Sequence, residues 1–193
     1  MKTVVLASKS PRRKELLESI GISFIVDPSD IEEIIDPQLP LEQVPNHLSK
    51  LKANDVASRY KNAIIIGADT VVIIDNQILG KPSSKEHAKK MLISLSGKTH
   101  KVITGFTILD TKTKKQVSSS VTTLVSVKTL TEQEIDEYIK TGEPFDAAGG
   151  YRVQGKYGKE LIEEVDGDLS NVIGFPIQDL KTELRRFELQ INS

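Results

Sequence analysis

The stretch VVLASKSPRRKELL, residues 4–17, joins a short apolar run directly to a cluster of serines and cations. The run at its start, Val4–Leu6, predicts a buried strand. Ser10 is placed to cap a helix, and Pro11 suits the first helical position because its φ is fixed and it has no N–H to leave unpaired. The stretch therefore predicts a strand that passes into a helix, and open α/β sheets bind their ligands at such turns.

Two arginines, Arg12 and Arg13, follow in the first turn of this predicted helix. The helix dipole makes that end positive, so each cation there costs about 0.3–1 kcal/mol. A bound anion would offset this cost, and the planar guanidinium suits phosphate oxygens. The alternative is that both side chains extend into solvent. We interpret the turn as a phosphate-binding site, with Ser8 and Ser10 as neutral donors.

Strand and helix patterns alternate along the rest of the chain. Further strands are predicted at 22–26, 63–75, 101–109 and 116–130, with residues 67–69 interrupting the strand at 63–75. Helices are predicted at 11–20, 41–59, 85–95, 132–140 and 176–187, and a glycine-bounded irregular segment at 149–154. The pattern favours one mixed α/β domain over residues 1–193, with a sheet between layers of helices.

The composition excludes several classes of protein. With 26 Lys and Arg against 27 Asp and Glu, the net charge is −1, which argues against a general binder of nucleic acid or membrane surfaces. The absence of cysteine excludes disulfides, thiolate zinc sites and cysteine nucleophiles. The first apolar run is too short for a secretory signal or a spanning helix. We therefore expect a cytoplasmic protein that binds neither nucleic acid nor membranes.

The common nucleotide-binding fingerprints are absent from the sequence. Residues 96–100 read SGKTH, but Leu92 stands where the phosphate-binding loop with this ending needs glycine. No G-x-G-x-x-G motif follows a strand. Phosphates would then be held by scattered cations, and Lys52 and Lys81 join the two arginines as candidates. For each lysine, a solvated surface position is the alternative.

An aspartate inside a long β-branched run is a second candidate site. We place Asp69 at the expected break of the strand, facing a ligand. Because a lone buried carboxylate is costly, Asp69 is either bonded to backbone amides as a structural group or serves as a general base or metal ligand. Glu33, in the acidic segment 27–40, is the preferred second carboxylate. Glu33 and Asp69 together form the predicted metal site, since Mg²⁺ favours carboxylates and phosphate oxygens.

The chain resembles the Maf family of nucleotide pyrophosphatases through six motifs in order, over roughly residues 4–176: ASKSPRR, GADTVV, GKP, SGKTHKVITG, TGEPFDAAGGYRVQG and VIGFP. The resemblance implies a mixed, twisted sheet flanked by helices, with two lobes around a deep cleft (Maf/ITPase-like). It implies hydrolysis of a nucleoside triphosphate between its α- and β-phosphates, which yields a monophosphate and pyrophosphate. It also implies a divalent metal cation, Mg²⁺ or Mn²⁺, and a homodimer.

The same resemblance implies roles for single residues. Asp69 is the implied proton acceptor, and substrate choice depends on three positions: Arg12, Thr70 and Gln154. This combination resembles the members that prefer dTTP and UTP. Because the Gln154 amide can also pair with cytosine when turned over, we expect CTP and modified pyrimidine nucleotides to be weaker or comparable substrates. Members that prefer 7-methyl-GTP carry tryptophan, glutamine and glutamate there. Ala147 departs from the family, which has lysine at that position, and a cation beside the phosphates is thereby lost.

Two alternatives stay open beside the role of clearing modified or surplus nucleotides. The loss of a lysine at Ala147 also fits a nucleotide-binding regulator of cell division with weak or no turnover. A pyrophosphatase with another base preference, such as 7-methyl-GTP, is the second. Arg152 is close enough in sequence to Ala147 to supply the missing charge.

Overall fold

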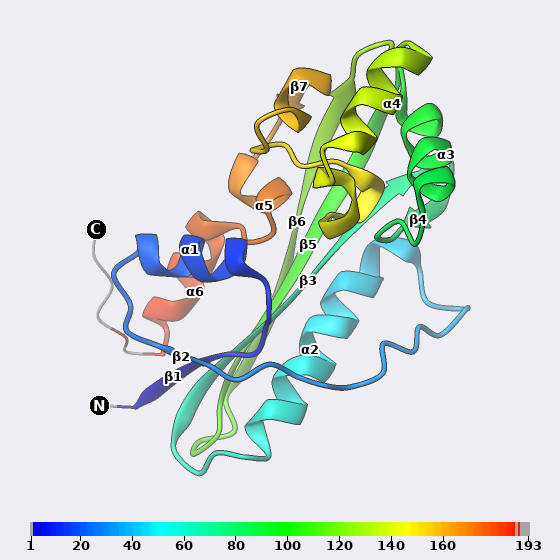
Figure 1. Ribbon diagram of the computed structural model, residues 1–193. Helices are drawn as coiled ribbons and strands as arrows, with labels where there is room; N and C mark the ends of the chain where they lie inside the picture. The colour runs from blue at the N-terminus through cyan, green and yellow to red at the C-terminus, as the bar shows by residue number, and fades with distance from the viewer. Residues whose placement is uncertain (1, 188, 190–193) are drawn as a thin grey trace. The chain divides into compact units, whose positions relative to one another are not determined.

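The computed structural model describes residues 2–187 and 189. Its strands are β1 (Thr3–Leu6), β2 (Ile25–Val26), β3 (Ala63–Ile74), β4 (Gln77–Leu79), β5 (Thr99–Asp110), β6 (Gln116–Val127) and β7 (Ile162–Asp166) (Figure 1). Its α-helices are α1 (Pro11–Ser19), α2 (Val44–Ala57), α3 (Lys85–Leu95), α4 (Glu132–Lys140), α5 (Leu169–Ile173) and α6 (Ile177–Arg185). Short 3₁₀ turns lie at Leu41–Gln43, Glu143–Asp146, Ala148–Gly150 and Gly158–Leu161.

Within the described residues, seven strands form one sheet in the order β2-β1-β3-β5-β6-β7, with β4 paired to β3. The strand β1, second from the edge of the sheet, runs parallel to both β2 and β3, whereas β4 is antiparallel to β3 and β7 is antiparallel to β6. The sheet is therefore mixed and flanked by helices, which confirms the predicted fold class.

The chain divides into two compact units. Unit 1 comprises Met1–Asp69, Thr104–Val121 and Gly174–Ser193, and unit 2 comprises Thr70–Ile103 and Thr122–Ile173. The long strands β3, β5 and β6 contribute residues to both units. The cleft between two lobes that the resemblance implies stays a prediction.

In unit 1, alternate residues of the strands face opposite sides of the sheet, as the two-residue period of a strand requires. On one side, α1 and α6 pack through a cluster that includes Leu6, Leu17, Ile66, Phe175 and Leu184. On the other side, α2 packs through a cluster that includes Val5, Ala53, Val56 and Ile65. Figure 1 shows α1 and α6 on one side of β1 and β3, and α2 on the other. Unit 1 thus has the predicted three layers.

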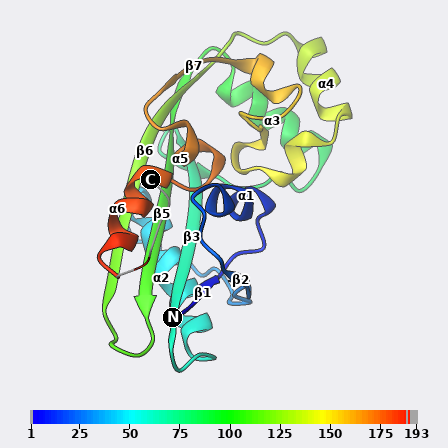
Figure 2. The same cartoon turned by 90° about the vertical axis from the view of Figure 1, so that its left-hand side faces the viewer.

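In unit 2, one hydrophobic cluster joins α3 and α4 to the sheet through residues that include Leu92, Leu95, Ile135, Val125 and Val127. The two helices lie side by side in both views (Figures 1 and 2). A capping box begins α4, in which Thr131 and Glu134 each accept the other's backbone N–H. The bounds of α3 and α4 are those predicted from the sequence.

The predicted interruption of the strand at 67–69 is wrong, because β3 is continuous from Ala63 to Ile74. Glycine is needed at Gly67 for close packing instead: a Cβ there would lie 2.4 Å from the carbonyl oxygen of Ser49 on α2. Asp69 consequently does not lie at a strand break. The strand predicted at 22–26 also shortens to β2, and the sequence patterns missed β4, β7 and α5, which are three to five residues long.

Among the described residues, no helix combines the length and the apolar character needed to cross a membrane.

Candidate active site

The turn before α1 is built from the two serines of the opening stretch. Ser10 caps the helix, since its Oγ accepts the backbone N–H of Arg13 at 3.5 Å. Ser8 is buried, and its Oγ accepts the N–H of Ser10 at 3.3 Å and the Nη1 group of Arg13 at 3.1 Å. The predicted cap is confirmed, while substrate contacts of Ser8 and Ser10 stay predictions.

The guanidinium of Arg13 connects three segments of unit 1. Besides Ser8, its Nη1 donates to the carbonyl of Ala68 at 3.0 Å, and its Nε donates to the carbonyl of Gly174 at 2.9 Å. Burial lowers the pKa of Arg13, and the charge of Asp69 acts against this shift. The side chain thereby joins α1 to β3 next to Asp69 and to the segment before α6. Phosphate binding by Arg12 and Arg13 stays a prediction.

Three predicted site residues come together around one ammonium group. Asp69 is buried, with 8% of its surface exposed. Its Oδ1 accepts a hydrogen bond from the Nζ of Lys52 at 2.6 Å. The same Nζ lies 2.7 Å from Oε1 of Glu33. Lys52 projects from α2, which approaches β3 closely at Gly67. We call Glu33, Lys52 and Asp69 the acid–lysine group.

Burial raises the pKa of Asp69 above its usual value. The charges of Lys52 and Arg13 lower it but do not outweigh burial, and Glu33 adds to the increase. Within the described part of the chain, Lys52 is the partner of this carboxylate, so the alternative of an aspartate held by backbone amides does not apply. A carboxylate whose pKa is raised by burial is suited to accept a proton.

The two carboxylates of the acid–lysine group are the candidate ligands for a divalent cation, whose binding stays a prediction. Glu33 and Asp69 each direct an oxygen at the same nitrogen, so two carboxylates converge on one cationic position. Residues 2–187 and 189 contain no cluster of three or more His, Cys, Asp or Glu side chains that could hold a metal by themselves. Two carboxylates completed by substrate oxygens and water are a usual donor set for Mg²⁺.

The remaining predicted substrate residues, apart from Arg12, belong to unit 2. Lys81 lies 2.9 Å from a carboxylate oxygen of Asp146, and both side chains are more than half exposed. Thr70 directly follows Asp69 in β3 and is half-buried. Gln154 is exposed and lies outside regular secondary structure. Substrate contacts of Lys81, Thr70 and Gln154 stay predictions.

Ala147, which stands where the family motif has lysine, is buried, with 8% of its surface exposed. Arg152 is half-buried, and its Nε is buried without a hydrogen-bond partner among the described residues. Its backbone N–H donates to the hydroxyl of Tyr138 at 3.1 Å. Replacement of the missing lysine by Arg152 stays a prediction.

Sequence reasoning missed a carboxylate that holds the segment around Gln154. Glu143 accepts the N–H of Gly158 at 3.0 Å and that of Tyr157 at 3.4 Å. It belongs to the motif TGEPFDAAGGYRVQG, which is the signal that could have drawn attention to it.

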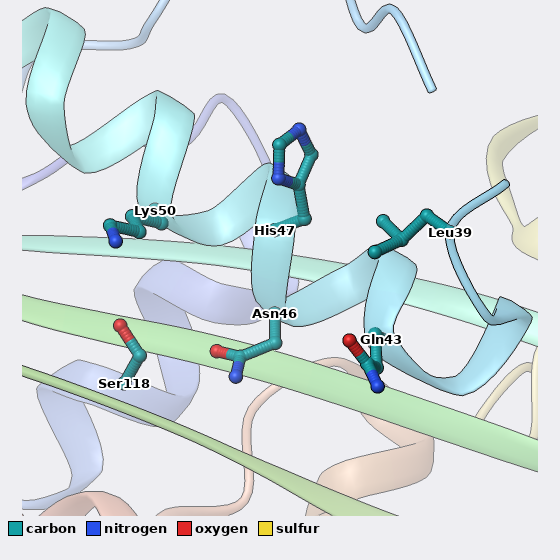
Figure 3. Close-up of a pocket in the computed structure, with 6 residues that line it drawn as sticks. All are labelled: Leu39, Gln43, Asn46, His47, Lys50 and Ser118. Atoms are coloured by element: carbon teal, nitrogen blue, oxygen red, sulfur yellow. The ribbon is translucent and has the colours of Figure 1, made fainter. Parts of the chain in front are cut away.

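A hollow in unit 1 of about 300 Å³ contains none of the predicted site residues. Its lining is shown in Figure 3 and consists of Leu39, Gln43, Asn46, His47, Lys50 and Ser118. Asn46 points toward the strand that carries Ser118, and its Oδ1 is buried without a partner among the described residues. The acid–lysine group is therefore separate from this hollow.

The fold and the acid–lysine group together define a mixed α/β protein with an ion-paired, largely buried aspartate. Within that class, the chain belongs to the Maf family, because the family described as "Maf-like protein" matches residues 3–187. The family assignment from the six motifs is thus confirmed.

Curated relatives match almost the whole chain. A "dTTP/UTP pyrophosphatase" from Caldicellulosiruptor saccharolyticus is 46% identical over 96% of this chain and 95% of its own. Proteins of the same name from Lachnoclostridium phytofermentans and Clostridioides difficile are 45% and 44% identical, over 99% and 95% of this chain and 98% and 94% of theirs.

A solved structure shares the fold at low sequence identity. It is titled "The structure of the Staphylococcus aureus Ham1 protein" and is similar with a TM-score of 0.55 at 13% identity, over 97% of this chain and 98% of that one. This similarity concerns the fold alone.

Proposed function

We propose that this chain hydrolyses nucleoside triphosphates, with dTTP and UTP as the best substrates, to the monophosphate and pyrophosphate. The observation that carries the proposal is Asp69, a buried carboxylate with a raised pKa that contacts Lys52. The relatives named dTTP/UTP pyrophosphatase support the substrate class.

In the proposed reaction, Asp69 accepts a proton from the attacking water. The water oxygen bonds to the α-phosphorus, and the bond from that phosphorus to the bridging oxygen breaks. Pyrophosphate leaves with the electron pair of that bond. Burial raises the pKa of Asp69, which favours this role, and Lys52 donates a hydrogen bond to its Oδ1.

Cations of the site are proposed to neutralise the charge on the leaving pyrophosphate. Arg12 and Arg13 stand in the first turn of α1, where the helix dipole adds to their attraction for phosphate. Arg13 also holds this turn beside β3 through its bonds to Ser8 and Ala68. Lys81 is the proposed cation of unit 2.

Glu33 and Asp69 are proposed to hold a divalent cation, Mg²⁺ or Mn²⁺, together with the substrate. When bound, such a cation supplies positive charge to phosphate oxygens. Removal of divalent cations by a chelator is then expected to abolish turnover, and addition of Mg²⁺ to restore it.

Base selection is proposed to involve Arg12, Thr70 and Gln154. Uracil and thymine present a carbonyl acceptor beside an N–H donor, and a glutamine amide offers one group of each kind. The exposed Gln154 amide is suited to this edge, although it also pairs with cytosine when turned over. CTP is therefore expected to be a weaker or comparable substrate, and purine triphosphates poor ones.

The biological setting is proposed as nucleotide-pool sanitation by a homodimer in the cytoplasm, without nucleic-acid or membrane partners. The composition without cysteine and the net charge of −1 agree with this setting. Light scattering of the purified protein tests the homodimer, and cell fractionation tests the location.

A nucleotide panel with product identification tests the function. Incubation with UTP, dTTP, CTP, GTP and 7-methyl-GTP is expected to release pyrophosphate in one step, fastest from UTP and dTTP. Orthophosphate as the first product would contradict the reaction, and tight nucleotide binding without turnover would indicate a regulator instead.

A further inference from the structure

Gln154 lies in a segment that no helix or strand holds. Between the buried Tyr151 and the buried Gly158, residues 153–157 form turns and a bend. A turn within the segment closes where Gly155 N–H donates to the carbonyl of Arg152 at 2.9 Å. An amide on such a segment loses conformational freedom when it binds a base, unless something else already orders the backbone.

Two side chains from elsewhere in unit 2 hold the two ends of this segment. At its start, the hydroxyl of Tyr138 on α4 accepts the N–H of Arg152 at 3.1 Å. At its end, the Glu143 carboxylate accepts the N–H groups of Tyr157 and Gly158. Hydrogen bonds from backbone amides to a charged carboxylate are stronger than those between neutral groups.

Glu143 also packs against the residue that follows Gln154. A Cβ at Gly155 would lie 2.2 Å from Oε2 of Glu143, so the carboxylate lies against Gly155, the residue directly after Gln154. At Gly158, a Cβ would lie 2.2 Å from the carbonyl oxygen of Arg152. The two ends of the segment are therefore in close contact. Glycine at both positions allows this close approach.

We propose that Glu143 is a positioning residue for base selection, because it holds the backbone that presents Gln154. The proposal rests on the proposed function, in which Gln154 contacts the base. Glu143 acts through backbone N–H groups and Gly155, so its loss changes how well the base is recognised rather than the chemistry at Asp69.

The test measures kcat and KM for UTP and GTP in Glu143→Ala and Glu143→Gln, each with and without Gln154→Ala. Glu137→Ala is the matched control, since Glu137 is an exposed glutamate of α4 that accepts a hydrogen bond from the side chain of Gln133. We expect Glu143→Ala to lower the UTP-to-GTP ratio of kcat/KM about 10-fold, through KM for UTP. Glu143→Gln, which keeps one accepting oxygen, is expected to lie between Glu143→Ala and the unmutated protein. In the Gln154→Ala background, Glu143→Ala is expected to change the ratio no further.

An unchanged ratio in Glu143→Ala, or an equal fall in both backgrounds, overturns the proposal. Hydrogen exchange of the Gly158 amide measures the same contact without activity and is expected to be faster in Glu143→Ala. The proposed function fails separately: if the unmutated protein does not prefer UTP over GTP, that function is wrong, whatever the exchange at Gly158.

Discussion

The two units differ in the polar groups that they bury. Unit 1 buries charge: Asp69 and Asp110 are almost inaccessible, and each carboxylate binds a lysine. In unit 2, within the described part of the chain, the buried polar residues are His100, Thr123 and Asn171, none of which carries a formal charge at pH 7. Its ion pairs, such as Lys81–Asp146, lie near the surface. Unit 1 therefore buries charged groups, the proposed proton acceptor among them, whereas these buried polar groups of unit 2 are neutral.

The two buried aspartates of unit 1 show how environment separates a catalytic from a structural carboxylate. Burial acts to raise the pKa of both. For Asp110, hydrogen bonds from Lys2 and from the backbone N–H groups of Lys112 and Thr113 outweigh burial and lower the pKa to about 2. For Asp69, burial outweighs the bond from Lys52. Of these two carboxylates, Asp69 is the one whose environment favours the uptake of a proton.

The largest expected effect is on turnover in Asp69→Asn. Loss of the proton acceptor is expected to reduce kcat about 100-fold or more, the range for general-base catalysis. The fold is expected to persist, because the amide is nearly isosteric. Steady-state pyrophosphate release and circular dichroism measure the two effects.

Asp75→Asn is the matched control, since Asp75 follows β3, is exposed and pairs with Lys98 at 2.8 Å. Its positive φ of 47° is tolerated by asparagine. Near-normal turnover in a folded Asp69→Asn protein would mean that Asp69 is not the proton acceptor. The proposed chemical difference between Asp69 and Asp110 would then not exist.

The next effect concerns base recognition in unit 2. Gln154→Glu replaces a donor to the uracil carbonyl with a negative charge, so kcat/KM for UTP is expected to fall about 5- to 150-fold. Turnover of a bound nucleotide is expected to change less, because the acid–lysine group is untouched. A kinetic panel of UTP, CTP and GTP measures the change, and an indifferent variant would exclude Gln154 from base recognition.

The smallest expected effect concerns stability and the buried histidine of unit 2. His100 shares a hydrogen bond of 2.7 Å with the Tyr151 hydroxyl, and burial lowers its pKa from 6.5 to about 4. Since the folded-state pKa is depressed, the unfolded chain gains a proton as the pH falls below 6.5 while the folded protein does not. Stability is therefore lost as the pH falls from 6.5 toward 4, by about 2 kcal/mol between pH 7 and pH 5 for this single group.

Urea unfolding of the unmutated protein and of His100→Gln at the two pH values measures this contribution as the difference between their pH dependences. His87→Gln is the control, since His87 is exposed on α3 and bonded to Ser83. The same pH dependence in all three proteins would mean that His100 takes up its proton in the folded state too, and unit 2 would then bury charge like unit 1.

Local patterns sufficed for much of the fold and for the members of the candidate site. The helical spacing at 85–95 and 132–140 predicted α3 and α4 to the residue, because caps and periodic apolar positions act over a few residues. The Ser-Pro-Arg-Arg turn predicted the start of α1 in the same way. Short elements such as β4 and β7 were missed because their pairing partners, rather than their own residues, stabilise them.

By itself, the sequence determined the mixed α/β class and the family, since these depend on periodicity and on motifs read along the chain, and it supplied the candidate site residues. Only the tertiary structure decided what each residue contacts. Gly67 reads as a strand break, yet it is the place where α2 meets a continuous strand. The sequence gives no reason to expect that Lys52 contacts both Glu33 and Asp69, because α2 places it between them only in the folded chain. Burial, which raises the pKa of Asp69, is a property of the packed elements around it and has no counterpart in the local sequence.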